Sequence, residues 1–171
     1  MIGRVTHPIV EHIPRLRRYA RALTGSPFRA DDLVQDTLER AFAKWHLWRT
    51  GTNLRAWLFA VMHNVFINQL EASRHDREAL PLDDAPEGLT LPTHDAVLGM
   101  GEIATALERL PVEQREVLLL VALEELKYEE VARALGVPIG TVMSRLSRAR
   151  ERLRRILAGN EARDASLKIV K

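Results

Sequence analysis

The chain of 171 residues contains no cysteine, so it can form no disulfide, no thiolate metal site and no cysteine nucleophile. Long apolar runs are missing too. A run such as Val117 to Leu123, which no other run exceeds, falls far short of the ~20 residues needed to cross a bilayer. The first residues lack the apolar stretch of a secretory signal. We therefore expect a cytoplasmic protein without membrane insertion.

Alternating apolar and polar residues, the pattern of a half-buried strand, are also missing, whereas apolar residues at helical spacing recur along the chain. Hydrophobic residues make up 46% of the sequence and charged residues 28%, as in ordinary soluble globular proteins. This composition argues against a fibre or a largely disordered chain. The helical spacing of the apolar residues and the composition together predict an all-α fold.

The formal net charge of +2 hides a strong asymmetry along the chain. Residues 1–30 carry six arginines and one acid, and residues 138–155 also carry six arginines and one acid. Between them, residues 76–108 carry eight acids and one arginine. Charge blocks of this kind indicate that different segments meet different partners, although solvated helix faces are the alternative.

A proline-rich acidic segment, Pro81 to Thr93, has no sustained apolar period and is typical of a linker. It separates two parts that are each small enough to be marginally stable alone. We expect two small helical domains joined by an acidic flexible linker. The boundaries we assign are 1–75 and 95–157 for the domains, 76–94 for the linker and 158–171 for a tail.

Helix signals place several elements within these domains. Ser26 followed by Pro27 is a good start signal, and Gly25 ends the helix before it. One apolar stripe, which includes Val34 and Trp45, is typical of an amphipathic helix. The expected helical segments are 8–24, 27–49, 53–74, 95–109, 112–124, 128–135 and 139–157.

The stretch from Tyr128 to Leu146 has the pattern of a helix-turn-helix, whose second helix enters the major groove of DNA. A short helix carries apolar Val131 and ends at Gly136, a residue that adopts the left-handed conformation without strain. A second helix then begins near Pro138.

At 100° per residue, one side of the second helix is apolar and predicts a core contact through Val142, Leu146, Ala149 and Leu153. The opposite side has small and hydroxyl residues, which let a helix sit deep in a groove, and arginines that reach bases or phosphates. The candidate DNA-binding residues are Thr141, Met143, Ser144, Arg145, Ser147, Arg148 and Arg152. A solvated helix in a structural bundle is the alternative, which the Gly136 turn disfavours.

The helix-turn-helix and the residues before it, from Leu107 to Leu153, resemble region 4 of bacterial extracytoplasmic-function (ECF) sigma factors. Independently, Arg29–Trp45 resembles their region 2.2 and Thr52–Arg74 their regions 2.3 and 2.4. Parts of the sequence further resemble the EcfG-like general-stress-response branch. The resemblance implies a protein that binds core RNA polymerase, directs it to a two-part promoter and helps to open the DNA. It also implies an anti-sigma factor as a partner, with no cofactor, metal or catalytic residue.

The resemblance implies roles for residues of the first domain. Those expected to bind core polymerase are Asp32, Gln35, Asp36, Glu39 and Arg40. Those expected to bind the minus-ten element are Trp48, Asn64, Asn68 and Arg74, with the loop His46–Asn53 holding an extruded base. Phe59 is a further candidate for base stacking, whereas we expect Trp57 in the core and His63 in a surface or packing role.

Two departures from the family pattern lie on the predicted groove face. Met143 stands where members commonly carry Lys or Arg, and Ser147 stands where a bulky residue is frequent. The minus-thirty-five contacts are therefore expected to depend on Ser144, Arg148 and phosphates. The acidic linker either mimics RNA in the exit channel of the polymerase or is a solvated tether.

Other functions fit the sequence less well. A sigma mimic would sequester an anti-sigma factor without binding DNA, but known mimics carry a receiver domain, for which 171 residues leave no room. The region 2 resemblance argues against a stand-alone helix-turn-helix repressor. A magnesium site at Asp31, Asp32 and Asp36 lacks a second acidic motif. An enzyme is least favoured, because no nucleophile–base pair, metal cluster or phosphate loop occurs.

Overall fold

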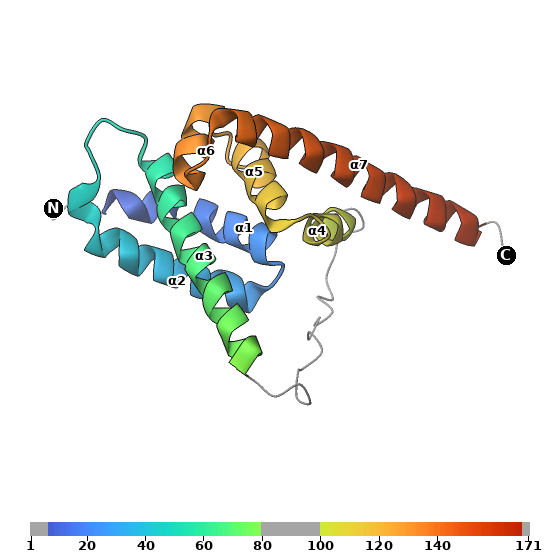
Figure 1. Ribbon diagram of the computed structural model, residues 1–171, viewed down its shortest axis with the longest axis horizontal. Helices are drawn as coiled ribbons and strands as arrows, with labels where there is room; N and C mark the ends of the chain where they lie inside the picture. Colours follow the sequence, from blue (N-terminus) through green and yellow to red (C-terminus); the bar gives the residue numbers. More distant parts are fainter. Residues whose placement is uncertain (1–6, 80–99, 169–171) are drawn as a thin grey trace, which may run out of the picture.

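A computed structural model describes residues 7–79 and 100–168, and within these ranges the chain consists of helices and their connections (Figure 1). The all-α prediction is thus confirmed, while most of the predicted linker lies outside the described residues. The elements are η1 (Pro8–His12), α1 (Ile13–Thr24), α2 (Pro27–Ala43), η2 (Trp45–Leu47), α3 (Leu54–Ala79), α4 (Met100–Glu108), α5 (Val112–Ala122), α6 (Tyr128–Leu135) and α7 (Ile139–Lys168).

The first predicted helix is divided, with a 3-10 turn before α1. Pro14 stands in the first turn of α1, where its missing N–H removes no helical hydrogen bond. Gly25 ends α1 at a φ of 68°, as the sequence indicated. The next helix begins at the predicted cap, since the Ser26 hydroxyl accepts the Arg29 N–H at 3.4 Å.

Helix α2 ends at Ala43, earlier than the predicted limit at residue 49. The chain turns there because Trp45, in η2, packs its ring against Trp48 and Trp57 at centroid distances of 4.9 and 6.2 Å. Trp45 therefore still covers the core, but from a 3-10 turn rather than from α2. The predicted apolar stripe is present, whereas the end of the helix is set by packing between aromatic rings.

Helices α1, α2 and α3 pack around a buried apolar core that includes Leu16, Leu33 and Met62. Phe59 belongs to this core: it is 2% exposed and meets Tyr19 edge to face at 4.9 Å. The suggestion that Phe59 stacks on a base is therefore wrong, because the ring is enclosed by the bundle. Trp57 is partly buried against the same core, as expected.

The second group of helices comprises α4, α5, α6 and α7. Helix α7 packs against each of the other three. Val142, Leu146 and Ala149 are buried on the inner side of α7, so its predicted core side is confirmed. Helix α7 continues to Lys168, beyond the predicted end at residue 157, and Figure 1 shows its last turns extending past the other helices. No proline interrupts residues 158–168, and the three alanines, with Arg163 and Leu167, favour a helix, although Gly159 does not.

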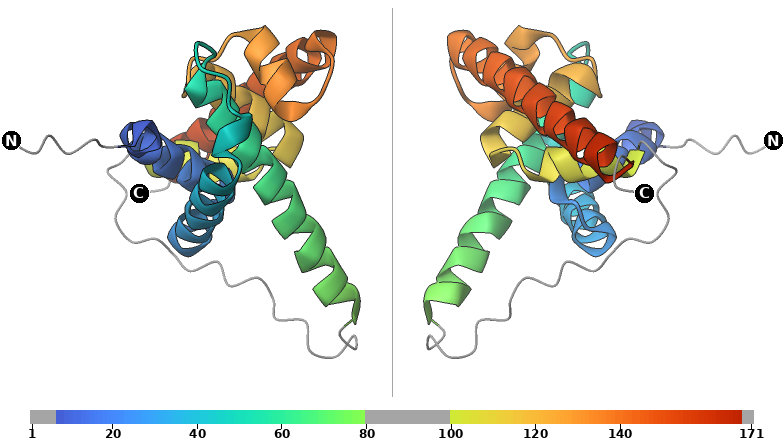
Figure 2. Two further views of the ribbon diagram at one scale, coloured as in Figure 1. Left: turned by 90° about the vertical axis from the view of Figure 1, so that its left-hand side faces the viewer. Right: turned by 90° about the vertical axis from the view of Figure 1, so that its right-hand side faces the viewer.

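The two groups of helices lie against each other, which the sequence did not predict. We call residues 7–79 the N-terminal half and residues 100–168 the C-terminal half. Helix α3 packs on α6, and α1 packs on α4 and α5 (Figures 1 and 2). Buried apolar side chains form one cluster that runs through both halves.

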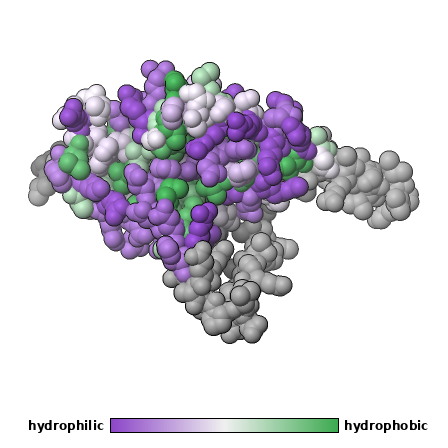
Figure 3. Space-filling view, viewed as in Figure 1, coloured by the Kyte–Doolittle hydropathy of each residue, from purple (hydrophilic) through white to green (hydrophobic). Residues whose placement is uncertain are grey.

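Figure 3 shows hydrophilic side chains over most of one face of the molecule, with apolar side chains in small separate groups. Among the described helices, none combines the length and the apolar character needed to span a bilayer. In Figure 2 the C-terminal turns of α3 project away from the other helices, leaving several sides of that segment open.

Candidate nucleic-acid interface

The turn between α6 and α7 fixes the angle at which α7 leaves the bundle. Gly136 has a φ of 64°, which favours glycine. The N–H of Val137 donates to the carbonyl of Ala132 at 3.0 Å, and that of Gly136 to the carbonyl of Arg133 at 3.4 Å. This pair of bonds is a Schellman motif, which closes α6 and turns the chain into α7. The helix-turn-helix predicted from the sequence is thus present as local geometry.

The residues predicted to bind the upstream, minus-thirty-five element lie on the outer side of α7 and on the two flanks of that side. Those that are exposed are Met143, Ser147, Arg148 and Arg152, and those that are half-buried are Thr141, Ser144 and Arg145. The Ser144 hydroxyl donates to the Thr141 carbonyl at 3.1 Å, which leaves its oxygen able to accept a bond. Met143 is 53% exposed and presents an apolar group beside this polar series.

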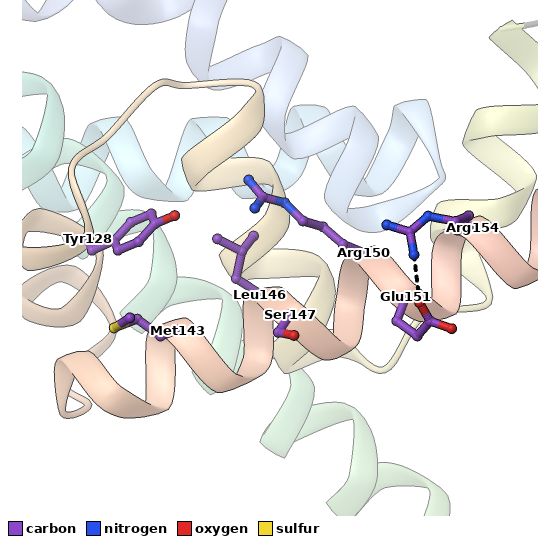
Figure 4. Close-up of a pocket in the computed structure, with 7 residues that line it drawn as sticks. All are labelled: Tyr128, Met143, Leu146, Ser147, Arg150, Glu151 and Arg154. Atoms are coloured by element: carbon purple, nitrogen blue, oxygen red, sulfur yellow. Dashed lines mark hydrogen bonds and ion pairs between the residues drawn. The ribbon is translucent and has the colours of Figure 1, made fainter.

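An open hollow of about 380 Å³ lies on one side of α7, where α6 meets it (Figure 4). Figure 4 shows the Tyr128 ring above Met143, and the guanidinium of Arg150 reaching over Leu146. The hollow therefore combines a phenol, an apolar floor and cationic groups. Its lining residues are Tyr128, Met143, Leu146, Ser147, Arg150, Glu151 and Arg154.

A second hollow, of about 410 Å³, borders α7 and is lined by Gln114, Ser147, Arg148, Glu151, Arg152 and Arg155. The Gln114 side-chain oxygen is buried there and has no hydrogen-bond partner in the described part of the chain. Both hollows share Ser147 and Glu151. The outer side of α7 therefore has a hollow on either side, one of mixed apolar and cationic lining and one of polar, mainly cationic lining.

Glu151 holds two of these arginines by exposed ion pairs, to Arg154 at 2.6 Å and to Arg155 at 3.0 Å. The hydrogen bond and the charge of Arg155 lower the pKa of Glu151; desolvation opposes them, and the charge of Arg154 adds the smallest contribution. Exposed pairs of this kind contribute little stability. Both arginines are thus free to exchange Glu151 for a stronger anionic partner.

Tyr128, Arg150 and Arg154 were not among the binding residues predicted from the sequence. The signal was present for the arginines, because Arg150 and Arg154 follow Met143 at helical spacings of seven and eleven residues on one side of α7. Tyr128 could not be selected in this way, since it comes from α6 and joins the hollow only through the packing of the two helices.

A groove of about 500 Å³ runs between α2 and α3. Asp36, Glu39 and Arg40, which are expected to bind polymerase, line this groove together with Asn68, which is expected to bind the minus-ten element. The other lining residues are Ala43, Val65, Gln69 and Ala72. Asp32 and Gln35 are exposed on α2, and the Gln35 amide donates to Glu39 at 3.2 Å. The structure thus brings Asn68 of the second predicted set beside Asp36, Glu39 and Arg40 of the first.

Gln69 was missed by sequence analysis, although it is central to this groove. Its side-chain amide donates to Asp36 at 2.7 Å and to Asp32 at 3.3 Å, which ties α3 to the acidic side of α2. Only the packing of α2 on α3 shows that the two carboxylates and this amide meet. Asp36 is half-buried as a result, whereas Asp32 stays exposed.

The predicted minus-ten residues do not share one environment. Asn64, Asn68 and Arg74 are exposed along α3, and the Asn64 amide donates to the Ala60 carbonyl at 2.9 Å. Trp48 is half-buried against Trp45, and its indole N–H is buried without a hydrogen-bond partner among the described residues. The side of α3 that carries Asn64, Asn68 and Arg74 is therefore accessible to a partner. Trp48 offers an unpaired indole N–H, but its ring is not fully exposed.

Comparisons with known families agree with this geometry. Residues 9–63 match the family described as the sigma2 domain of PhyR, and residues 100–153 match sigma-70 region 4. The chain is 38% identical over 156 residues to the ECF RNA polymerase sigma factor EcfG of Rhodopseudomonas palustris, covering 91% of this chain and 86% of that protein. It is 35% identical to the ECF sigma factor SigE of Mycolicibacterium smegmatis, over 91% of this chain and 62% of that protein.

A solved structure is similar as well: the sigma factor RpoE of Bartonella quintana, in complex with the anti-sigma factor NepR. The two chains share 34% identity and a TM-score of 0.73, over 88% of this chain and 94% of that one. A region 2 domain followed by a helix-turn-helix region 4 defines a protein of the sigma-70 class. Within that class, the chain belongs to the ECF RNA polymerase sigma factors, and its EcfG-like character is confirmed. Members of this family direct RNA polymerase to promoters and are not enzymes.

Proposed function

We propose that the chain reads a two-part promoter with two separate surfaces, and that α7 reads the upstream, minus-thirty-five element. The observation that carries this proposal is the outer side of α7, where exposed Ser147 and Arg148 follow the Schellman turn at Gly136. An arginine can donate two bonds to the edge of a guanine, and a serine can bond to any base edge. The domain division 1–75, 76–94, 95–157 and 158–171 is part of this proposal.

Other arginines of α7 would bind the phosphates of the DNA backbone. Arg152 lines one hollow beside α7, and Arg150 and Arg154 line the other, beside Tyr128. Arg145 is half-buried and follows the helical spacing of Arg152, seven residues before it. DNA phosphates would displace Glu151 from its exposed ion pairs, because phosphates accept stronger charge-assisted bonds from arginine. Such contacts position the helix without selecting a sequence.

The N-terminal half would engage core polymerase and the minus-ten element along the groove between α2 and α3. The carboxylates of Asp36 and Glu39 give this groove an acidic side, which suits a basic surface of the polymerase. Asn64, Asn68 and Arg74 would bind the separated DNA strand, since an asparagine amide can pair with an exposed base edge. The unused indole N–H of Trp48 is a further donor for that strand.

The complex of the Bartonella relative with NepR supports an anti-sigma factor as a partner of this chain too. We place its action in the cytoplasm, where core polymerase works, and assign it no catalytic activity and no cofactor. A second function, that of a sigma mimic that sequesters an anti-sigma factor, is favoured by the match of residues 9–63 to the sigma2 domain of PhyR. DNA binding by α7 distinguishes the two functions.

Replacing Arg148 with alanine tests this distinction. If Arg148 reads a base, the variant should bind the upstream element more weakly by ~1–3 kcal/mol, which is roughly a five- to 150-fold rise in Kd. The measurement is the fluorescence anisotropy of labelled promoter DNA, titrated with the complex of the chain and core polymerase. Arg109→Ala is the control, because Arg109 is exposed and lies outside α7. An unchanged Kd and footprint for Arg148→Ala would assign this arginine a structural role.

A further inference from the structure

Two large apolar side chains of α7 are exposed in the first turns of the helix. Ile139 is 42% exposed and Met143 is 53% exposed. They are four residues apart, so they are neighbours on one side of the helix. Ser147, four residues further on, is exposed as well and continues the row. The beginning of α7 therefore presents an apolar pair followed by a hydroxyl.

A ring from another helix lies beside this pair. Tyr128 of α6 and Met143 line the same hollow, and Figure 4 shows the Tyr128 ring above the methionine side chain. An aromatic ring beside a thioether is a favourable contact. Since Met143 stays 53% exposed, the ring limits where its side chain can lie without covering it.

Gly140, three residues before Met143, has no role that the fold explains. It is exposed and helical, without a positive φ. A Cβ at this position would meet no atom of the described residues within 4 Å. Alanine would suit this helix better than glycine if folding were the only requirement. A glycine that folding does not require indicates that another molecule approaches the backbone of α7 there.

The chemistry of the apolar pair selects what that molecule can be. In the major groove of DNA, the bases present hydrogen-bond donors and acceptors and one apolar group, the methyl group at C5 of thymine. The Ile139 side chain has no polar atom, and the Met143 thioether is only a weak acceptor. Phosphates need donors or cations, which this pair lacks. The thymine methyl group is therefore the feature of DNA that the pair complements.

The surroundings of the pair favour DNA over a protein partner. Arg148 is exposed next to Ser147, and Arg150 and Arg154 line the hollow that Met143 shares. Arginines around an apolar pair suit a base edge that lies between phosphates. A specific protein interface takes roughly 20–30 residues from each partner, far more than this short row offers.

We propose that Ile139 and Met143 select thymine in the upstream element by contact with its 5-methyl group, while Gly140 leaves room for the base edge. This inference rests on the proposed function, because it places α7 in the major groove of that element. Met143 and Arg148 are five residues apart, about 7.5 Å along the helix axis, or about two base pairs at ~3.4 Å each. The selected thymine therefore lies within about three base pairs of the base that Arg148 reads.

Deoxyuridine tests the proposal, because it differs from thymidine only in lacking this methyl group. Promoter duplexes recovered by transcription in vitro from a genomic library are synthesised with deoxyuridine at one upstream-element thymine at a time. Fluorescence anisotropy gives their Kd for the complex of the native chain with core polymerase. We expect about a fourfold rise in Kd at one or two neighbouring thymines, the effect of one buried carbon group. An upstream element without thymine, or no rise at any thymine, would overturn the proposal.

Met143→Ala separates contact with the methyl group from other effects of this side chain. The ratio of the Kd values for the deoxyuridine and thymine duplexes should fall from about four to below two, since the coupled partner is gone. Ile103→Ala is the matched control, because Ile103 is apolar and 49% exposed on α4, and it should keep the native ratio. If Met143→Ala keeps the native ratio, even with weaker binding of both duplexes, the proposal is overturned and Met143 has another partner.

Gly140→Leu tests the approach of the base edge to α7. A Cβ at this position meets open space and leucine favours a helix, so the variant should stay folded, which far-UV circular dichroism checks. Its Kd for the unmodified promoter should rise at least fivefold, because the new side chain occupies the place of the DNA. Gly159→Leu is the same change in open space on the same helix and should bind like the native chain. Equal Kd values for the two variants would overturn the proposed approach.

Failure of the proposed function would give a different result. If the complex of the native chain and core polymerase binds no duplex more tightly than core polymerase alone, promoter reading by this chain is rejected, and thymine selection with it. If the complex binds particular promoters but responds to no 5-methyl group, only the selection of thymine is rejected.

Discussion

Replacing Asp36 with arginine is expected to weaken the binding of core RNA polymerase at least tenfold while the chain stays folded. Asp36 lines the groove between α2 and α3 and accepts a bond from Gln69 at 2.7 Å. A cation at this position would face the basic partner surface that the acidic groove suits, and like charges brought together at an interface cost several kcal/mol. Isothermal titration calorimetry with purified core polymerase measures the effect.

Asp31→Arg is the matched control for this prediction. Asp31 is exposed on the same helix, undergoes the same charge change and does not line the groove. It should bind core polymerase about as well as the native chain. If Asp36→Arg and Asp31→Arg bind equally well, the docking surface lies elsewhere on the molecule.

The second large effect is expected from Arg115→Met, which should lower the free energy of unfolding by about 2–4 kcal/mol. Arg115 is only 8% exposed, and its guanidinium donates to the carbonyls of Leu23, Glu108 and Leu110 at 2.6, 2.6 and 3.1 Å. Methionine fills a similar space but leaves these buried acceptors without a donor. Loss of a cation near the end of α1 also removes a favourable interaction with the helix dipole.

Urea unfolding followed by circular dichroism measures this change, with Arg109→Met as the control. Arg109 lies close to Arg115 in sequence, but its side chain is exposed, so its replacement should change the free energy by less than ~0.5 kcal/mol. Burial lowers the pKa of the Arg115 guanidinium, with the charge of Glu108 acting in the opposite direction. A loss below ~0.5 kcal/mol for Arg115→Met would mean that its three bonds contribute little to folding.

Much of the local structure could be predicted from the sequence because local rules decide it. Ser26 begins α2 and Gly136 ends α6, since a capping hydroxyl and a left-handed glycine act within a few residues. The apolar spacing of Val142 and Leu146 identified the buried side of α7. The residues expected to bind the minus-thirty-five element were predicted from the same helical spacing.

The contact between the halves could not be predicted, because the residues that form it look like surface residues in the sequence. Arg115 and Glu124 are charged, and charged side chains are buried only when distant partners compensate them. Phe59 was misplaced for a related reason, since its edge-to-face contact comes from Tyr19 on another helix. Gln69 and Tyr128 likewise join their sites only through helix packing.

As an ECF sigma factor, this chain is expected to direct core polymerase to a two-part promoter. The most direct measurement is transcription in vitro from a genomic promoter library, with core polymerase, the purified chain and sequencing of the transcript starts. We expect transcripts that start at a fixed distance downstream of a shared pair of sequence elements and disappear when the chain is omitted. Transcription no higher than with core polymerase alone, or starts that share no upstream sequence, would contradict it.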